Sequence, residues 1–554
     1  MALSRKKIAV VASMFAVAAG FAYFAVSTHP SFQGGVRPPI RGFEFSRPDA
    51  LIRSSGLSRL PPDLLRIPVA RNVLTEDFVD YYEHNENREA LLGTLKRITY
   101  EHRLDLSEQL LEKAFGEPAE IALWRDEGGR LKNFALAMKQ NALARLIRLL
   151  LPLTDAQVSS AGTLQGTDVP ILVVTYGSRY RLLILSRGDR VVALSDPGML
   201  LKAGEVKGGE VPGQDDAAAA VIAELLDGEA SPFARHFQAD EDLPARGHEI
   251  MLGAPVFALG YAQFVPDLRG VRLVFDDAGR WQSAVLLDSA VARHWNAASL
   301  WRAMPHGAAF CAALPVAWPS LMDAFAAWRE KADGAPPSEK EKESLGKEFE
   351  PLAAVCWYQG ERFYAPLFAA QFKEPVKKEE GLRWLEWTMR MTRAEHEIRD
   401  GTQDGSWIWE GRLASRHGKR GESGEEVYLT PTLAIQDFIF DAERPRDFFF
   451  FSPEADLVKR ARDVAGKKYP ALADDAKGQG ASRMLAVVNP GALAALAKAE
   501  VFAALPRGEE ADFRNAADAY LVPRLDALAK FPAQRLLLRA SQSAPWYPLE
   551  WSGQ

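Results

Sequence analysis

The sequence contains only two cysteines, Cys311 and Cys356, among its 554 residues. Both lie in apolar runs typical of strands, and neither has the polar neighbours that would activate a thiol, so a catalytic cysteine is disfavoured. Two neighbouring strands could join the pair in a disulfide, but two separately buried thiols would give the same pattern. The sequence therefore leaves both states of this pair open.

The sequence also lacks the short motifs that accompany common catalytic chemistry. It contains no G-x-S-x-G nucleophile motif, no H-E-x-x-H zinc motif and no phosphate-binding P-loop. The pairs His248-Glu249 and His396-Glu397 lack the second histidine that would place two metal ligands on one helical face. We therefore predict no catalytic residue, no metal site and no cofactor.

An excess of positive charge is absent as well. The formal net charge is -6, and it is -9 without the three cations at positions 5–7, which disfavours nucleic acid as a partner. The exception is the segment 35–71, which contains seven arginines and only three acidic residues. These arginines could form a basic face near a membrane, or a solvated face with some ion pairs. The candidates for the basic face are Arg37, Arg41, Arg47 and Arg53.

One long apolar run is present near the N-terminus. Residues 8–26 contain no charged side chain and follow Arg5, Lys6 and Lys7. A helix of this length spans about 30 Å, which matches the hydrocarbon core of a bilayer, and the basic cluster is expected to stay in the cytoplasm. A cleaved signal peptide is the alternative, but its apolar core is usually shorter, roughly 7–15 residues. We therefore predict a retained signal anchor, with the rest of the chain across the membrane.

Composition and length predict how the chain is divided into domains. With 47% hydrophobic and 25% charged residues it is ordinary globular material, and its length favours two or more domains. The predicted divisions are a cytoplasmic tail (1–7), a transmembrane signal anchor (8–27), a Gly- and Pro-rich stalk (28–45), a first half (46–330), a charged linker with a short helix (331–349) and a second half (350–554).

A weak internal repeat supports that division. The segment 117–124 aligns with 350–357, and each ends in tryptophan and precedes a turn. Chance similarity of two hairpins is the competing explanation. The predicted fold class is α+β: an N-terminal transmembrane helix followed by two related halves, each a mostly antiparallel sheet with packed helices.

Local patterns predict individual elements. Leucine spacing predicts a helix over 57–65, and an alanine-rich composition predicts a helix over 215–226. Strands are expected over 120–124, 134–138, 169–175, 180–186, 191–194, 255–264, 271–275, 283–287 and 448–451, the last buried on both faces.

Four of the thirteen tryptophans fall between residues 384 and 409. Trp384 and Trp387 have helical spacing, whereas Trp407 and Trp409 have strand spacing, so each pair shares one face of its element. Exposed, these rings would make a glycan platform or a protein-binding site; buried, they belong to a core.

Several stretches resemble the YfaA-like family of uncharacterised proteins of Gram-negative bacteria. The similar segments are 46–52, 60–65, 74–78, 84–86, 231–237, 260–264, 311–318, 354–358 and 548–551. The resemblance implies a protein of the bacterial inner membrane, with a single pass and the bulk of the chain in the periplasm. It also implies association with a bacterial alpha-2-macroglobulin, a thioester protease trap, because the genes of the family travel with it. No catalytic residue is known for the family, so none is carried over.

Three hypotheses for function follow. The first is a non-enzymatic, inner-membrane-anchored accessory or scaffold protein that docks a partner such as the macroglobulin and neighbouring periplasmic proteins. The second is a periplasmic glycan- or peptidoglycan-binding module that uses the four tryptophans. The third, a periplasmic hydrolase, requires a pocket with converging titratable groups.

Overall fold

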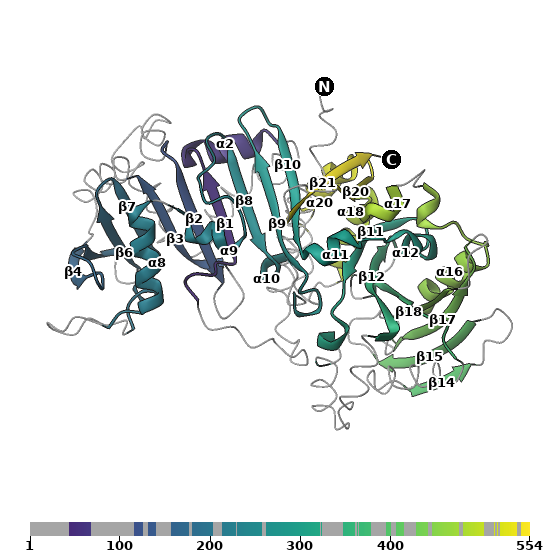
Figure 1. Cartoon of the computed structure of the whole chain (residues 1–554). Coiled ribbons are helices and arrows are strands. Elements are labelled where there is room, and N and C mark those ends of the chain that lie inside the picture. The colour runs from purple at the N-terminus through teal and green to yellow at the C-terminus, as the bar shows by residue number, and fades with distance from the viewer. Residues whose placement is uncertain are drawn as a thin grey trace.

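The computed structural model describes much of the chain after residue 43. The described residues are 44–67, 116–125, 131–139, 157–176, 180–202, 213–228, 230–257, 262–321, 323, 347–360, 363, 365–377, 395–399, 406–414, 428–440, 446–475, 480–503, 515, 518, 521–539 and 545–553. Their strands pair antiparallel throughout and join into one continuous sheet, with helices packed on it (Figure 1).

One part of this sheet is built from the strands before residue 288. These are β1 (Ala50–Ser54), β2 (Ala119–Arg125), β3 (Leu131–Lys139), β4 (Gln157–Thr163), β5 (Pro170–Tyr176), β6 (Tyr180–Arg187), β7 (Arg190–Leu194), β8 (His248–Gly253), β9 (Leu268–Phe275) and β10 (Trp281–Leu287). Their order across the sheet is β4-β5-β6-β7-β3-β2-β1-β8-β9-β10.

The sheet continues through the strands after residue 307. These are β11 (Ala308–Pro315), β12 (Phe349–Tyr358), β13 (Leu367–Phe372), β14 (Glu395–Arg399), β15 (Ser406–Ala414), β16 (Tyr428–Leu429), β17 (Thr432–Phe438), β18 (Arg446–Ser452), β19 (Met484–Val488), β20 (Gln534–Leu538) and β21 (Trp546–Gly553). Their order is β21-β20-β19-β11-β12-β13-β18-β17-β15-β14, and β16 also pairs with β15.

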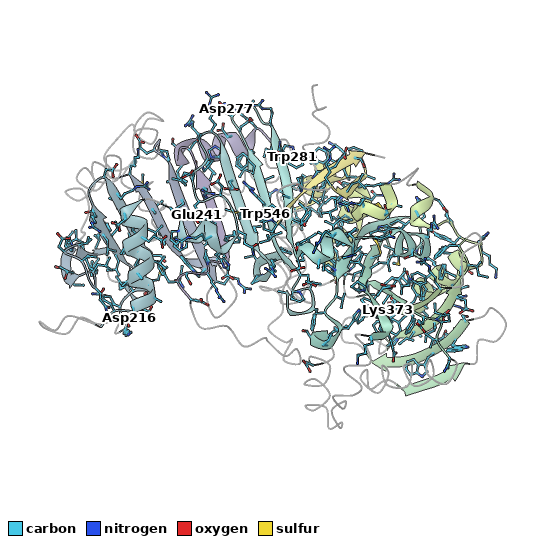
Figure 2. The ribbon with its side chains drawn as sticks, in the orientation of Figure 1. Asp216, Glu241, Asp277, Trp281, Lys373 and Trp546 are labelled. Atoms are coloured by element: carbon cyan, nitrogen blue, oxygen red, sulfur yellow. A yellow bond between two sulfur atoms is a disulfide. The ribbon has the colours of Figure 1, made fainter. Side chains whose placement is uncertain are left out.

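The pairing of β10 with β21 makes this a single sheet. Ser283 lies opposite Leu549 and Leu286 lies opposite Trp546, so the C-terminal strand is hydrogen-bonded at the middle of the sheet. Figure 2 labels Trp281 and Trp546 where these strands meet. The predicted fold class is therefore wrong, because it gives each of two halves its own sheet. Sequence periodicity predicts strands but does not specify which distant strands pair, and here the pairing continues from one end of the sheet to the other.

The order of pairing repeats inside this one sheet. β1 lies between β2 and β8, and β11 lies in the same way between β12 and β19. The aligned segments 117–124 and 350–357 fall on β2 and β12, which begin equivalent hairpins. β11 precedes the linker predicted at 331–349, yet both of its partner strands follow it, so strand pairing crosses that boundary.

The helices and short turns of the described residues lie between these strands. They are η1 (Leu57–Arg59), α2 (Leu60–Leu65), η3 (Pro197–Met199), α8 (Asp216–Asp227), α9 (Pro232–His236), α10 (Ala254–Phe257), η4 (Ala262–Phe264), α11 (Ser289–Arg293), α12 (Ala298–Ala303), α16 (Ala455–Ala465), η5 (Leu472–Asp475), α17 (Gly480–Arg483), α18 (Pro490–Ala503) and α20 (Val522–Ala529). α8 packs on β6 and β7, α16 on β17 and β18, and α18 on β11 and β12.

Local sequence explains why α8 forms. Four alanines follow Asp216, and alanine has the highest helix propensity. The Asp215 side chain caps the first turn by accepting a hydrogen bond from the Ala218 N–H. Gly228 ends the helix in a left-handed conformation, with a φ of 73°. The apolar face, which includes Ile222, then packs on the sheet in a common core.

The predicted membrane anchor, residues 8–27, lies outside the described residues, as does nearly all of the predicted stalk. Among the residues that the structure describes, no helix is both long and apolar enough to cross a membrane.

Candidate functional site

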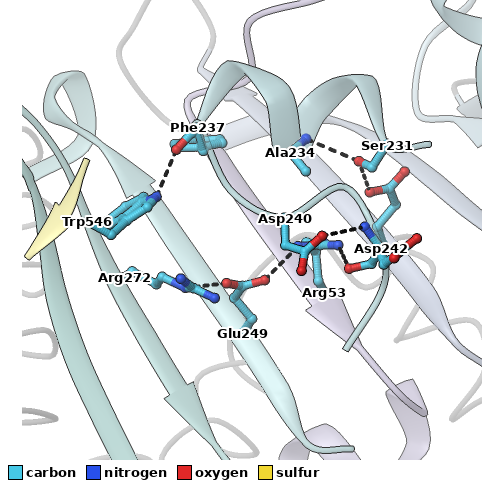
Figure 3. Close-up of polar contacts among 10 residues, drawn as sticks. Arg53, Ser231, Ala234, Phe237, Asp240, Asp242, Glu249, Arg272 and Trp546 are labelled. Atoms are coloured by element: carbon cyan, nitrogen blue, oxygen red, sulfur yellow. Dashed lines mark hydrogen bonds and ion pairs between the residues drawn. The ribbon is translucent and has the colours of Figure 1, made fainter. Parts of the chain in front are cut away.

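Four charged side chains form a row across one face of the sheet, on β2, β1, β8 and β9. Arg53 lies directly opposite both Glu120 and Glu249 in the strand register. Its Nη1 donates to the Glu249 carboxylate over 2.8 Å, and Arg272 pairs with the same carboxylate. Figure 3 shows the chain of contacts from Arg272 through Glu249 to Arg53. The charges alternate in sign along this row, so each buried charge lies beside an opposite one.

The segment 231–242 contacts this row of charges. The Asp242 carbonyl accepts a hydrogen bond from Arg53 Nη2, and the Ser231 hydroxyl donates to Glu120. Ser231 also caps α9, because its hydroxyl accepts from the Ala234 N–H. Burial raises the pKa of Glu120, while the Ser231 hydrogen bond and the nearby charge of Arg53 act in the opposite direction. α9 is thereby fixed against the sheet.

A second polar network involves the next residue along β1. The Ser54 hydroxyl lies 2.8 Å from Nδ1 of His248, whose Nε2 lies 3.0 Å from the Asp63 carboxylate. The Ser54 oxygen also accepts a hydrogen bond from the Gly56 N–H, so it lies between two partners. These are the three residue types, in the same order of contact, of the hydrolytic triad.

The surroundings of this triad fit a structural role. Ser54 is 0% exposed, and His248 and Asp63 are also buried. A serine nucleophile must reach a substrate carbonyl, and the Ser54 oxygen is closed off and already hydrogen-bonded. What the network does is attach α2, through Asp63, to β1 and β8. Among the residues that the structure describes, no group of three or more His, Cys, Asp or Glu side chains could hold a metal ion.

Sequence patterns did not reveal these two networks. Arg53 and Ser54 are about 190 residues from Glu249 and His248 in sequence, and no local motif connects them. The informative feature in β1 is an arginine among apolar residues of a short strand, because an arginine there must find a buried partner.

The two cysteines lie directly opposite each other on β11 and β12, and the structure joins them by a disulfide. Both are fully buried in the large core beneath these strands. The sequence left open whether the two cysteines are bonded or free. The structure has them bonded, and the disulfide links the neighbouring strands β11 and β12.

The tryptophans predicted as a binding platform do not share one environment. Trp409 is 0% exposed and packs with Leu433, so its ring is closed to a glycan. Trp407 is half-buried on the same face of β15. Trp384 and Trp387 lie outside the described residues. For Trp409 the binding prediction is therefore wrong, because Leu433, Phe449 and Phe451 of β17 and β18 pack around this ring.

The predicted basic face also changes. Arg53 is 1% exposed and paired with Glu249, so its assignment to a membrane-facing surface is wrong. Arg47 is exposed and forms an ion pair with Glu44. Arg37 and Arg41 lie outside the described residues.

Comparison with known proteins places this chain in a family. A family model described as "Uncharacterized protein conserved in bacteria (DUF2138)" matches residues 7–551. The chain is 28% identical over 537 residues to the "Uncharacterized protein YfaA" of Escherichia coli (strain K12), covering 92% of this chain and 90% of that protein. No solved structure matches. Since the family model extends over nearly the whole chain, this protein belongs to the DUF2138 family of proteins conserved in bacteria.

Proposed function

We propose that this protein is an inner-membrane-anchored periplasmic scaffold that docks a partner protein and performs no chemistry itself. The observation that carries the proposal is how the described residues use their reactive side chains. Ser54, His248 and Asp63 are closed off and fasten a helix to the sheet, and Arg53 and Glu249 fasten a second segment. Polar side chains that fasten segments to the sheet make it rigid, which supports the hypothesis of a scaffold.

Two features support the proposed membrane anchor and the proposed periplasmic location. The apolar run 8–26 follows three cations, and the family match begins at residue 7 and so includes this run. Disulfides persist in oxidising compartments such as the periplasm, so the bond between Cys311 and Cys356 is consistent with export of the chain.

The proposed partner is a bacterial alpha-2-macroglobulin. This part rests on the resemblance to the YfaA-like family, whose genes travel with that protease trap. A long sheet anchored to the membrane would hold such a large protein near the membrane surface.

Affinity purification of the tagged, full-length protein from mild detergent, followed by mass spectrometry, tests the partner. We expect a bacterial alpha-2-macroglobulin at near-stoichiometric amounts. An unrelated inner-membrane protein with the same tag is the control. Recovery of the bait alone, from cells that express the macroglobulin, would contradict the proposed partnership.

Thiol labelling tests the compartment separately. Protein taken from cells and denatured without reductant should not react with a maleimide, and it should gain two labels after reduction, one for each cysteine. Two labels without reductant would mean that the thiols are free and would remove this support for export.

A further inference from the structure

Asp437 on β17 lies directly opposite Asp447 on β18. Like charges opposite each other on paired strands are destabilising, so two ionised carboxylates would oppose the pairing of these strand ends. Asp447 is buried, whereas Asp437 reaches solvent. Because the two residues are directly opposite each other, their side chains lie on the same face of the sheet, and a proton shared between the two carboxyl groups would remove the repulsion.

The proton is held near neutral pH. Partial burial raises the pKa of Asp437 to about 7, and the neighbouring Asp447 carboxyl group adds to the shift. The pair therefore shares a proton below that pH, and it loses the proton as the pH rises through about 7.

A neighbouring segment depends on the same carboxyl pair. The Val376 N–H donates a hydrogen bond to the Asp447 carboxylate. Val376 follows β13, which pairs with the other edge of β18, so the bond fastens residues 373–377 beside that strand. The ends of β13, β18 and β17 thus meet at one carboxyl pair.

Val376 also packs against an aromatic cluster. Trp318 stacks on Phe349 with a centroid distance of 4.6 Å, and Phe349 stacks on Phe372 at 4.3 Å. All three rings are buried, and Val376 is among the half-buried side chains that pack on them. Displacement of the segment 373–377 would therefore uncover an apolar surface.

The other charged groups nearby do not contribute to the raised pKa of Asp437. Lys373, Glu374 and Lys377 lie on the fastened segment and are exposed to solvent, and Figure 2 labels Lys373. Arg446 lies opposite Phe438, and strand alternation directs it to the other face of the sheet from Asp447. Asp447 is the one charged group that contributes to the raised pKa of Asp437.

We propose that Asp437 and Asp447 form a proton-dependent latch that holds residues 373–377 against β18 and over the aromatic cluster. With a shared proton the latch is closed. When both carboxyl groups ionise, their repulsion separates the strand ends and releases the segment. The latch is independent of the proposed scaffold function, and it makes exposure of the aromatic cluster depend on pH.

Amide hydrogen exchange on the full-length protein in detergent tests the latch. Protection factors, corrected for the intrinsic pH dependence of exchange, are compared at pH 6 and pH 8.5 for peptides that contain Val376. We expect protection to fall roughly tenfold at the higher pH. Peptides from β11 and β12 should keep their protection, which distinguishes local release from global unfolding.

Two variants complete the test. Asp437→Asn donates a hydrogen bond to Asp447 at any pH, so its Val376 protection should be the same at both values. Asp168→Asn, an exposed aspartate in the turn before β5, should behave as the wild type does. Equal protection of the wild type at both pH values would mean that Asp437 merely turns into solvent, and would overturn the proposal. A fall in Asp437→Asn as large as in the wild type would overturn it too.

Discussion

At the scale of single residues, the most consequential feature is a buried row of alternating charges. Arg53 and Glu249 are both buried and form an ion pair, and Glu249 also pairs with Arg272. Removing one member of such a pair leaves an uncompensated buried charge, which is more damaging than losing an exposed pair. Stability should therefore respond very differently to substitutions at buried and exposed ion pairs.

Glu249→Ala should lower the free energy of unfolding by about 3 kcal/mol, because the buried Arg53 and its neighbour Arg272 both lose the carboxylate that they share. Asp227→Ala removes the exposed partner of Arg187 and should change it by less than about 0.5 kcal/mol. Urea denaturation followed by circular dichroism compares the two. Equal losses in both variants would contradict the role given to the buried row.

Glu120 should make stability depend on pH. Burial raises its pKa in the folded protein above the value in the unfolded chain, so the folded state binds the proton more tightly. Its contribution to stability is complete below the unfolded pKa and is lost as the pH rises through the folded one.

Glu120→Gln keeps an acceptor for the Ser231 hydroxyl and removes this titration. The denaturation midpoint of the variant should therefore fall less than that of the wild type between pH 5 and pH 8. Parallel midpoint curves for the two proteins would show that Glu120 does not titrate in this range.

At the scale of elements, eight of the nine strand ranges expected from sequence patterns coincide with strands, but the patterns did not give their partners. The expected strands at 120–124 and 134–138 appear as β2 and β3, and the helix expected at 215–226 appears as α8. The strand expected at 255–264 is wrong, because α10 and η4 occupy the described parts of that range. A short apolar run fits a strand and a buried helical turn equally well.

The cap of α8 offers a test at this scale. Asp215→Ala removes the acceptor for the Ala218 N–H and should destabilise the protein by about 1 kcal/mol. Asp216→Ala, one position inside the helix, loses only an interaction with the helix dipole and should cost a few tenths of a kcal/mol, roughly. Thermal unfolding of both variants compares them, and a reversed order would show that the Asp215 side chain does not cap α8.

At the scale of the whole molecule, the C-terminal strand makes the sheet continuous. Trp546 on β21 is buried, and its indole N–H donates to the Phe237 carbonyl over 3.0 Å. Trp551 on the same strand donates to the Ser283 hydroxyl on β10 over 2.8 Å. The last strand of the chain is thus packed against elements encoded some 270 to 310 residues earlier.

Trp546→Ala should therefore weaken strands on both sides of the β10–β21 pair. The lost ring leaves a cavity worth about 3–5 kcal/mol, and hydrogen-exchange protection should fall in both β10 and β20. Tyr547→Phe, which removes a single hydroxyl from the same strand, is the matched control. Loss of protection confined to β20 and β21 would mean that the sheet is not coupled through this strand pair.

The sequence by itself determined the properties that depend on local order along the chain. Alternation predicts strands, an alanine-rich segment predicts α8, and an apolar run behind three cations predicts a membrane anchor, because each signal lies within one segment. The tertiary structure alone decided which strands pair, where Arg53 and Trp409 are buried, and that Ser54, His248 and Asp63 meet in a closed network. Those contacts join residues that are nearly 200 to more than 300 positions apart. No local pattern encodes them, since they depend on how the whole sheet assembles.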